Sequence, residues 1–189
     1  MAGDQTVLMT KALLVIDIQE SFRRRPSWAE VSNPDVADDA ARLVNAARAA
    51  GDTVVWVLHS EPGTGTPFDP LSGHVRLMDG LVPRDGEPVL TKTSRNAFTT
   101  TNLQQLLTSL GIRELVICGI QTEQCCETTA RLAADLGYDV TFVTDATATF
   151  PIPHRDDPSR SLSTADIVER TEYALAGRFA TIASVASLA

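Results

Sequence analysis

The chain has few cysteines, few aromatic residues and no long hydrophobic run. Its three cysteines all lie between positions 118 and 126, and an odd number in one short stretch gives no disulfide framework. Their spacing also lacks the paired C-x-x-C pattern of a structural zinc site. No apolar stretch approaches the roughly 20 residues that a membrane-spanning helix needs. We therefore expect free thiols and no membrane partner.

Positive charge is also scarce. Lysine and arginine number 16 against 24 aspartates and glutamates, which gives a formal net charge of −8, and the longest basic run is Arg23-Arg24-Arg25. Nucleic acids and anionic membranes are bound through concentrated positive charge, so neither is expected as a partner. The first residues show no export signal, and free thiols persist in a reducing compartment, so the expected location is the cytoplasm.

The composition that remains is that of a folded protein. Hydrophobic residues make up 43% and charged residues 21% of the 189 residues. This length suits one compact domain that covers residues 1–189 and leaves no room for a second large module.

Strand-like and helix-like segments alternate along the chain. Short apolar runs predict strands at 12–16, 54–58, 89–90, 114–118, 139–144 and 179–183. Helices are expected over 34–50, 103–110, 124–136 and 163–176. The first of these has Asn33 as its N-cap, Pro34 as its first residue and Gly51 after its end. The alternation predicts an α/β fold, a three-layer α/β/α domain with a Rossmann-like, six-stranded and mainly parallel sheet.

Reactive side chains follow the predicted strands. Ligands of such sheets bind outside the carboxyl ends of the strands, where the sequence has Asp17, His59, Lys92 and the turn 119–122. The proline- and glycine-rich loop 59–87 is expected to form a wall of this site or a subunit contact. Within that loop, Arg76 could meet a substrate carboxylate or form a surface ion pair.

Cys125 stands where a buried strand turns into a helix. If Thr122 is the N-cap, Cys125 is the third helical residue, where unpaired amides and the positive helix end stabilise a thiolate. Cys118 lies inside an apolar strand, and Cys126 points about 100° around the helix from its neighbour, so both are expected to pack in the core. Cys125 is therefore the candidate nucleophile, although a buried cysteine is often only a small apolar residue.

A nucleophilic thiol needs a base and a stabilising charge. Asp17 closes the first buried strand, where desolvation raises the pKa of a carboxylate into a useful range. Lys92 follows the third strand and supplies a cation. Alone, each is more often a loop cap or a surface residue, but together they point to one site.

Three segments resemble the signatures of the isochorismatase-like cysteine hydrolases. They are Asp17-Ile18-Gln19-Glu20-Ser21-Phe22, Lys92-Thr93-Ser94-Arg95-Asn96-Ala97-Phe98 and Gly119-Ile120-Gln121-Thr122-Glu123-Gln124-Cys125, in the family order, and the resemblance runs from about residue 11 to 183. It implies a catalytic triad of Asp17, Lys92 and Cys125. It also implies a non-proline cis peptide, expected at Ile120–Gln121, that aims the Gln121 and Cys125 amides at an oxyanion.

The resemblance implies hydrolysis of a small molecule without a cofactor, usually by a homo-oligomer. Retention of Cys125 favours cleavage of an amide or ureido C–N bond through a thioester. Vinyl ether hydrolysis of the isochorismatase type and nicotinamidase activity remain alternatives. The nicotinamidase branch binds a metal ion after the second strand. At this place the chain has similar ligand types, His59, Glu61 and His74, in a different arrangement. A divalent ion bound by these three residues is conceivable but not expected.

Substrate contacts are less well determined by sequence. The candidates are aromatic or polar residues near the strand ends, for which core packing is an equally good explanation: Gln19, Phe22, Trp28, Phe98, Gln121, Phe150 and His154. A non-enzymatic alternative is a thiol redox sensor or scaffold in which Asp17 and Lys92 form a structural ion pair. Adjacent cysteines seldom form an unstrained disulfide, which counts against it.

Overall fold

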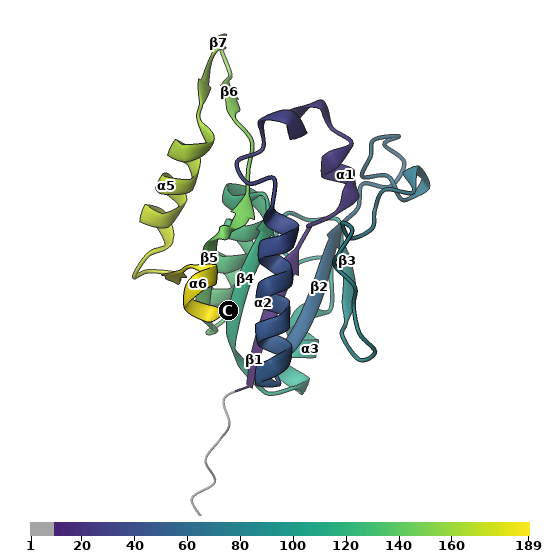
Figure 1. The fold of residues 1–189 in the computed structure, drawn as a ribbon, viewed down its shortest axis with the longest axis vertical. Coiled ribbons are helices and arrows are strands. Elements are labelled where there is room, and N and C mark those ends of the chain that lie inside the picture. The colour runs from purple at the N-terminus through teal and green to yellow at the C-terminus, as the bar shows by residue number, and fades with distance from the viewer. Residues whose placement is uncertain (1–9) are drawn as a thin grey trace, which may run out of the picture.

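The computed structural model describes residues 10–189 and contains a parallel sheet of six strands (Figure 1). The residues before these, on which the expectation of no export signal was based, lie outside the described part. The strand order is β3-β2-β1-β4-β5-β8, and every neighbouring pair is parallel. The bounds are β1 Thr10–Ile16, β2 Thr53–His59, β3 Val89–Lys92, β4 Ile112–Ile120, β5 Asp139–Ala148 and β8 Thr181–Ala183.

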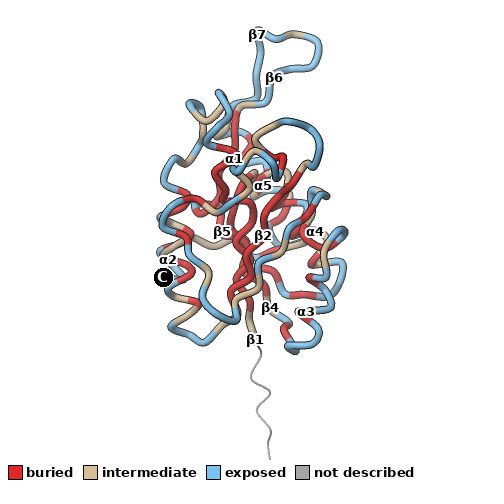
Figure 2. The backbone as a smooth tube through the Cα atoms, turned by 90° about the vertical axis from the view of Figure 1, so that its right-hand side faces the viewer, coloured by how far each residue is buried: buried red, intermediate tan, exposed pale blue. Residues whose placement is uncertain are grey.

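Helices cover both faces of the sheet. The core on one face includes α2 (Val36–Ala50) and α6 (Val185–Leu188), and the core on the other includes α3 (Leu103–Ser109), α4 (Glu127–Asp135) and α5 (Thr164–Leu175). Strand β1 contributes side chains to both cores. Leu13 and Val15 face the first core, and Leu14 and Ile16 face the second. The buried strands therefore form a central layer (Figure 2), and the predicted three-layer α/β architecture is confirmed.

The structure differs from the sequence prediction at several element ends. Helix α2 begins at Val36 rather than at residue 34, because the Asn33 side chain accepts a hydrogen bond from the Asp35 amide in a turn before the helix. Its end is as predicted, at a left-handed Gly51 with φ of 79°. Strands β3, β4 and β5 extend beyond the predicted runs, since pairing with neighbouring strands continues into less apolar residues.

A short hairpin was not predicted. Strands β6 (Ile152–His154) and β7 (Asp157–Leu162) pair antiparallel and project from the body of the domain (Figure 1). The hairpin is largely exposed and carries no apolar alternation, so the sequence offers no strand signal there.

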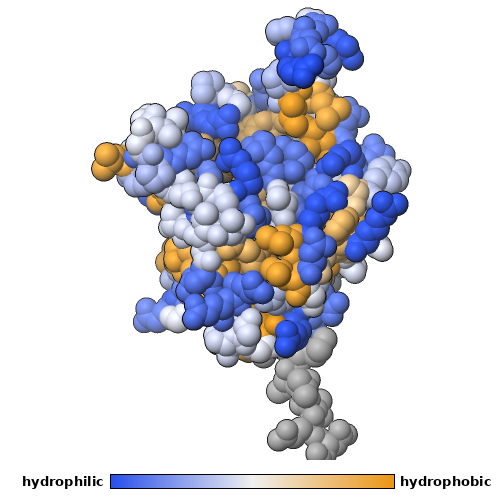
Figure 3. Space-filling model, turned by 180° about the vertical axis from the view of Figure 1, so that it is seen from behind, coloured by the Kyte–Doolittle hydropathy of each residue, from blue (hydrophilic) through white to orange (hydrophobic). Residues whose placement is uncertain are grey.

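Two smaller helical segments precede α2. The short α1 (Glu20–Arg23) follows β1, and a 3₁₀ helix spans Pro26–Glu30. A second 3₁₀ helix, Pro70–Ser72, lies in the long loop after β2. Among residues 10–189, no helix has the length and hydrophobicity to cross a membrane. The face seen in Figure 3 carries its apolar side chains in separate patches among polar ones.

Candidate active site

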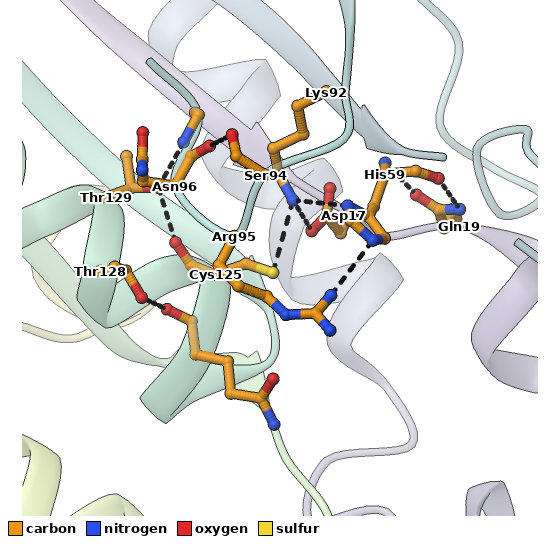
Figure 4. A network of polar contacts seen from close by, with 12 residues as sticks. Asp17, Gln19, His59, Lys92, Ser94, Arg95, Asn96, Cys125, Thr128 and Thr129 are labelled. Atoms are coloured by element: carbon orange, nitrogen blue, oxygen red, sulfur yellow. Dashed lines mark hydrogen bonds and ion pairs between the residues drawn. The ribbon is translucent and has the colours of Figure 1, made fainter. Parts of the chain in front are cut away.

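Asp17, Lys92 and Cys125 meet at the carboxyl edge of the sheet. Asp17 directly follows β1, Lys92 is the last residue of β3, and Cys125 lies in the first turn after β4. Strand β2 separates β1 from β3, so the lysine side chain crosses the end of β2 to reach the aspartate. Figure 4 shows the three side chains pointing toward one another.

Asp17 has a left-handed backbone conformation, with φ of 54°. Its amide donates to the Val57 carbonyl at 2.8 Å, so the chain leaves the sheet with the carboxylate aimed at Lys92. The carboxylate is fully buried, and its Oδ2 accepts from Lys92 Nζ at 2.7 Å. Within residues 10–189, no hydrogen-bond partner is present for the buried Oδ1. This oxygen is free to accept a proton.

Lys92 uses three donor directions at once. Besides Asp17, Nζ lies 3.4 Å from Cys125 Sγ and 3.3 Å from His59 Nδ1. The side chain has no exposed surface, although lysine is rarely buried without charged partners. These contacts hold one ammonium against a carboxylate, a thiol and an imidazole.

The turn that carries Cys125 differs from the predicted capping geometry. The peptide bond between Ile120 and Gln121 is cis. The helix opens with a π turn, Thr122–Cys126, whose N-cap is Gln121, and the Thr122 hydroxyl donates to Thr147 Oγ1 at 2.8 Å. The expectation that Thr122 caps the helix and that Cys125 is its third residue is therefore wrong.

Burial changes the acid–base properties of the site. It raises the pKa of Asp17, partly offset by the charge of Lys92. Burial, followed by the negative charge of Asp17, raises the pKa of Cys125 to about 12. The expectation of a thiolate stabilised by the helix end is therefore not met in the resting protein, because desolvation and Asp17 outweigh Lys92. Cys125 therefore needs a nearby proton acceptor to become a thiolate, and the Asp17 carboxylate lies beside the thiol.

The other two cysteines lie in the core, as predicted. Cys118 and Cys126 have no exposed surface, and burial raises the pKa of Cys118 to about 12 and that of Cys126 well above its usual value. All three thiols are free.

His59 connects the lysine to two charged residues of the cavity wall. Because the ammonium can only donate, Nδ1 accepts from Lys92. The other ring nitrogen, Nε2, lies 3.2 Å from Glu61 Oε1 and 3.1 Å from Arg95 NH1. Arg95 pairs with the same carboxylate at 3.7 Å. Burial, followed by the charge of Lys92, lowers the pKa of His59 and keeps the imidazole neutral.

A cavity of about 460 Å³ opens over Cys125. Two predicted catalytic residues, Asp17 and Cys125, line this cavity. Three predicted substrate contacts also line it: Phe22, Gln121 and Phe150. The loop after β2 forms part of its wall, as expected, through Glu61 and Phe68. Residues that the sequence analysis did not single out as substrate contacts also line it: Arg25, Ser27, Arg95, Gln124, Pro151, Ile152 and Pro153.

Five predicted substrate contacts lie elsewhere. Gln19 is buried and bridges Ser21 to the His59 main chain, so it fixes the end of β2. Phe98 stacks on Tyr138 with ring centroids 6.1 Å apart, and Trp28 packs behind Phe150. The remaining two are exposed: His154 lies on the β6–β7 hairpin, and Arg76 pairs with Asp79 at 3.3 Å. Each of these five side chains makes apolar or local polar contacts within the protein.

The alternative metal site is not assembled. His59 and Glu61 are adjacent, but no group of three histidine, cysteine, aspartate or glutamate side chains suited to a metal ion occurs in the described part of the chain. His59 also faces the Lys92 ammonium, and Arg95 NH1 lies 3.1 Å from Nε2. Two cations at these nitrogens oppose a third, so this donor set does not fit a divalent ion.

The geometry agrees with comparisons to known proteins. The sequence model of the isochorismatase domain matches residues 11–172. The chain belongs to the isochorismatase family. An isochorismatase from Pseudomonas putida is similar in structure, with a TM-score of 0.85, 34% identity and coverage of 96% of this chain and 91% of that one. The family assignment makes the protein a hydrolase.

The relatives of this chain include proteins that are named for different activities. A streptothricin hydrolase from Streptomyces noursei is 34% identical over 87% of this chain and 59% of its own length. A ureidoacrylate amidohydrolase from Klebsiella pneumoniae is 29% identical over 72% of each chain. The family therefore includes hydrolases with different substrates.

Proposed function

We propose that this isochorismatase-family hydrolase cleaves an amide or ureido C–N bond of a small molecule through a thioester on Cys125. The observation that carries the proposal is the contact of one buried ammonium, Lys92, with both Asp17 and Cys125, which line the cavity. A thiol with a base and a cation at hydrogen-bonding distance is the arrangement of an activated nucleophile.

In the first half-reaction, Asp17 takes the proton of Cys125 as the sulfur attacks the carbonyl carbon. The raised pKa of Asp17 makes it a stronger base than an exposed carboxylate, and Lys92 stabilises the thiolate charge. The main-chain amides of Gln121 and Cys125 donate to the oxyanion of the tetrahedral intermediate. Asp17 then gives the proton to the leaving nitrogen, the C–N bond breaks and the acyl group stays on sulfur.

In the second half-reaction, Asp17 removes a proton from water. The hydroxide adds to the thioester carbon, the C–S bond breaks and the acid product leaves. Asp17 returns its proton to the sulfur, which restores the resting thiol. His59 and Lys92 act by position and charge and gain or lose no proton in the cycle.

Intact-protein mass spectrometry with a panel of small amides, ureides, nicotinamide and isochorismate tests the proposal. We expect an acyl adduct on Cys125 in wild-type protein that is quenched in acid during turnover, and neither adduct nor turnover in Asp17→Asn or Cys125→Ala. Cys126→Ala is the matched control, because it removes the adjacent thiol and leaves Cys125 in place.

Other outcomes would select the alternatives. Turnover of isochorismate that persists in Cys125→Ala would indicate vinyl ether hydrolysis and contradict the proposal. Absence of turnover and of any adduct, together with reversible oxidation of the thiols, would favour the redox alternative.

A further inference from the structure

The charges around the cavity are paired, with one exception. Asp17 is matched by Lys92, and Glu61 is matched by Arg95. Arg25 lines the same cavity, and within residues 10–189 no carboxylate lies at ion-pairing distance from it. An acidic chain of net charge −8 thus places an unmatched cation at its reactive cavity.

The position of Arg25 is set by its backbone and by an aromatic ring. Its amide donates to the Phe22 carbonyl at 3.1 Å, and its carbonyl accepts from the Trp28 amide at 3.0 Å. The guanidinium lies 6.0 Å from the centre of the Phe150 ring, a cation–π distance. Arg25 is exposed, and its head group contacts the Phe150 ring without forming an ion pair within residues 10–189.

The Ser27 hydroxyl is a second polar group of the cavity that lacks a partner within residues 10–189. Ser27 lines the cavity, and its buried Oγ has no hydrogen-bond partner in the described chain. A buried hydroxyl without a partner is destabilising, so such a group usually receives one from a bound molecule or water. The hydroxyl and the guanidinium lie two residues apart in the segment that begins the 3₁₀ helix.

Aromatic rings form the apolar part of the cavity wall. Phe22 contacts Phe68 edge to face at 4.9 Å between centroids and stacks on Phe150 at 5.9 Å, and all three rings line the cavity. A ligand in the cavity therefore meets an apolar surface. Cys125, Arg25 and Ser27 line the same cavity, so one ligand can meet the nucleophile and the cation together.

We propose that the substrate carries an anionic end group, in the first instance a carboxylate, which Arg25 and Ser27 bind while the scissile carbonyl lies at Cys125. The inference rests on the proposed function for the reacting end of the substrate. Arg25 donates to the carboxylate through its guanidinium, and Ser27 donates its unmatched hydroxyl hydrogen. The substrate class is a small amide or ureide with an apolar middle and a distal carboxylate.

Hydrolysis of matched amides tests this specificity. Succinamate carries a carboxylate, levulinamide is neutral and of similar length, and γ-aminobutyramide is cationic. We expect kcat/KM for succinamate to exceed that for levulinamide by about tenfold or more, and the ratio to fall as ionic strength rises. Arg25→Gln is expected to bring the ratio close to one through KM, and Ser27→Ala to lower it about threefold.

Two further variants make the test specific. Arg24→Gln removes the adjacent exposed arginine, which does not line the cavity, and is expected to keep the wild-type ratio. Arg25→Glu is expected to shift the preference toward γ-aminobutyramide. A ratio that collapses in Arg95→Gln but survives in Arg25→Gln would overturn the assignment to Arg25.

Binding to Cys125→Ala separates this inference from the proposed function. By calorimetry, we expect succinamate to bind this variant more tightly than levulinamide, and the advantage to disappear when Arg25→Gln is added. Binding with this pattern but without hydrolysis in the wild type would refute the proposed function and leave the anion site standing. Equal binding of the two amides, or no binding of succinamate, would overturn the anion site even if amides were hydrolysed.

Discussion

Lys92 Nζ donates to Asp17 Oδ2 across 2.7 Å, and neither side chain has any exposed surface. Burying an ion pair removes both charged groups from water, which costs free energy. The attraction between the two charges offsets this cost when their geometry is good. Here the same ammonium also contacts Cys125 and His59. The pair therefore links the stability of the domain to the chemistry of the site.

Removing one partner of this pair is expected to destabilise the protein strongly. Lys92→Met leaves a buried carboxylate unmatched, and we expect the free energy of unfolding to fall by about 3–5 kcal/mol. Adding Asp17→Asn should restore much of the loss, because neither charge then remains. Urea unfolding of the two single variants and the double variant measures this coupling, and additive losses would contradict it.

The reactivity of Cys125 is expected to increase when Asp17 loses its charge. Asp17 raises the pKa of Cys125 and Lys92 lowers it, so in Asp17→Asn the thiol pKa falls and the thiolate fraction at pH 7 rises. Iodoacetamide should label Cys125 about tenfold faster than in the wild type for each pKa unit lost, although hydrolysis is abolished. Lys92→Met should slow the labelling. An unchanged rate in Asp17→Asn would show that its carboxylate does not control the thiol.

His59 is expected to act as a positioning residue for Lys92. His59→Leu removes the acceptor at Nδ1, so the ammonium loses one of its three contacts, and we expect kcat to fall by about tenfold or more. His59→Asn keeps an acceptor near the Nδ1 position and should recover part of kcat. Equal losses of kcat in the two variants would assign His59 to packing alone.

A carboxylate far from the site is expected to control acid stability. Arg48, followed by weaker contacts that include Trp56, lowers the pKa of Glu87 from 4.5 to about 2. Because the folded-state pKa is the lower one, this stabilisation is present above pH 4.5 and disappears as the pH falls toward 2. Glu87→Gln should therefore lower the free energy of unfolding by about 2 kcal/mol at pH 7. The difference from the wild type should shrink in acid, and a constant difference would contradict the linkage.

Gly119 is expected to tolerate no side chain. Its φ is +143°, and an added Cβ would lie 2.0 Å from the Ile16 carbonyl oxygen. Gly119→Ala must push β4 away from β1 at the point where Asp17 and the Cys125 turn meet, and we expect a loss of about 3 kcal/mol or more with reduced turnover. Gly137→Ala is the matched control, because its φ is +89° but nothing lies within 4 Å of the added atom. Similar stability losses in both variants would mean that backbone strain, and not the close strand contact, governs Gly119.

The parts of the fold that depend on local patterning were predictable. Apolar runs such as 12–16 and 54–58 need burial on both faces, and the structure places them in the central layer. Two features could not be predicted: the start of α2 and the β6–β7 hairpin. Both the Asn33 turn before α2 and the exposed hairpin depend on a few polar contacts. Thr122 illustrates the same limit, since its hydroxyl bonds to Thr147, which lies far along the chain, and not to the helix that follows it.

The positions of Asp17, Lys92 and Cys125 at strand ends could be inferred from the sequence, because parallel strands bring their carboxyl ends to one edge. The effect of these groups on one another could not, because it depends on the folded protein. Burial keeps Cys125 protonated, and the third contact of Lys92 goes to His59. The unmatched Arg25 likewise became visible only when the cavity was assembled. Desolvation and charge pairing depend on side chains that meet in space from distant segments, and a local sequence pattern does not contain that information.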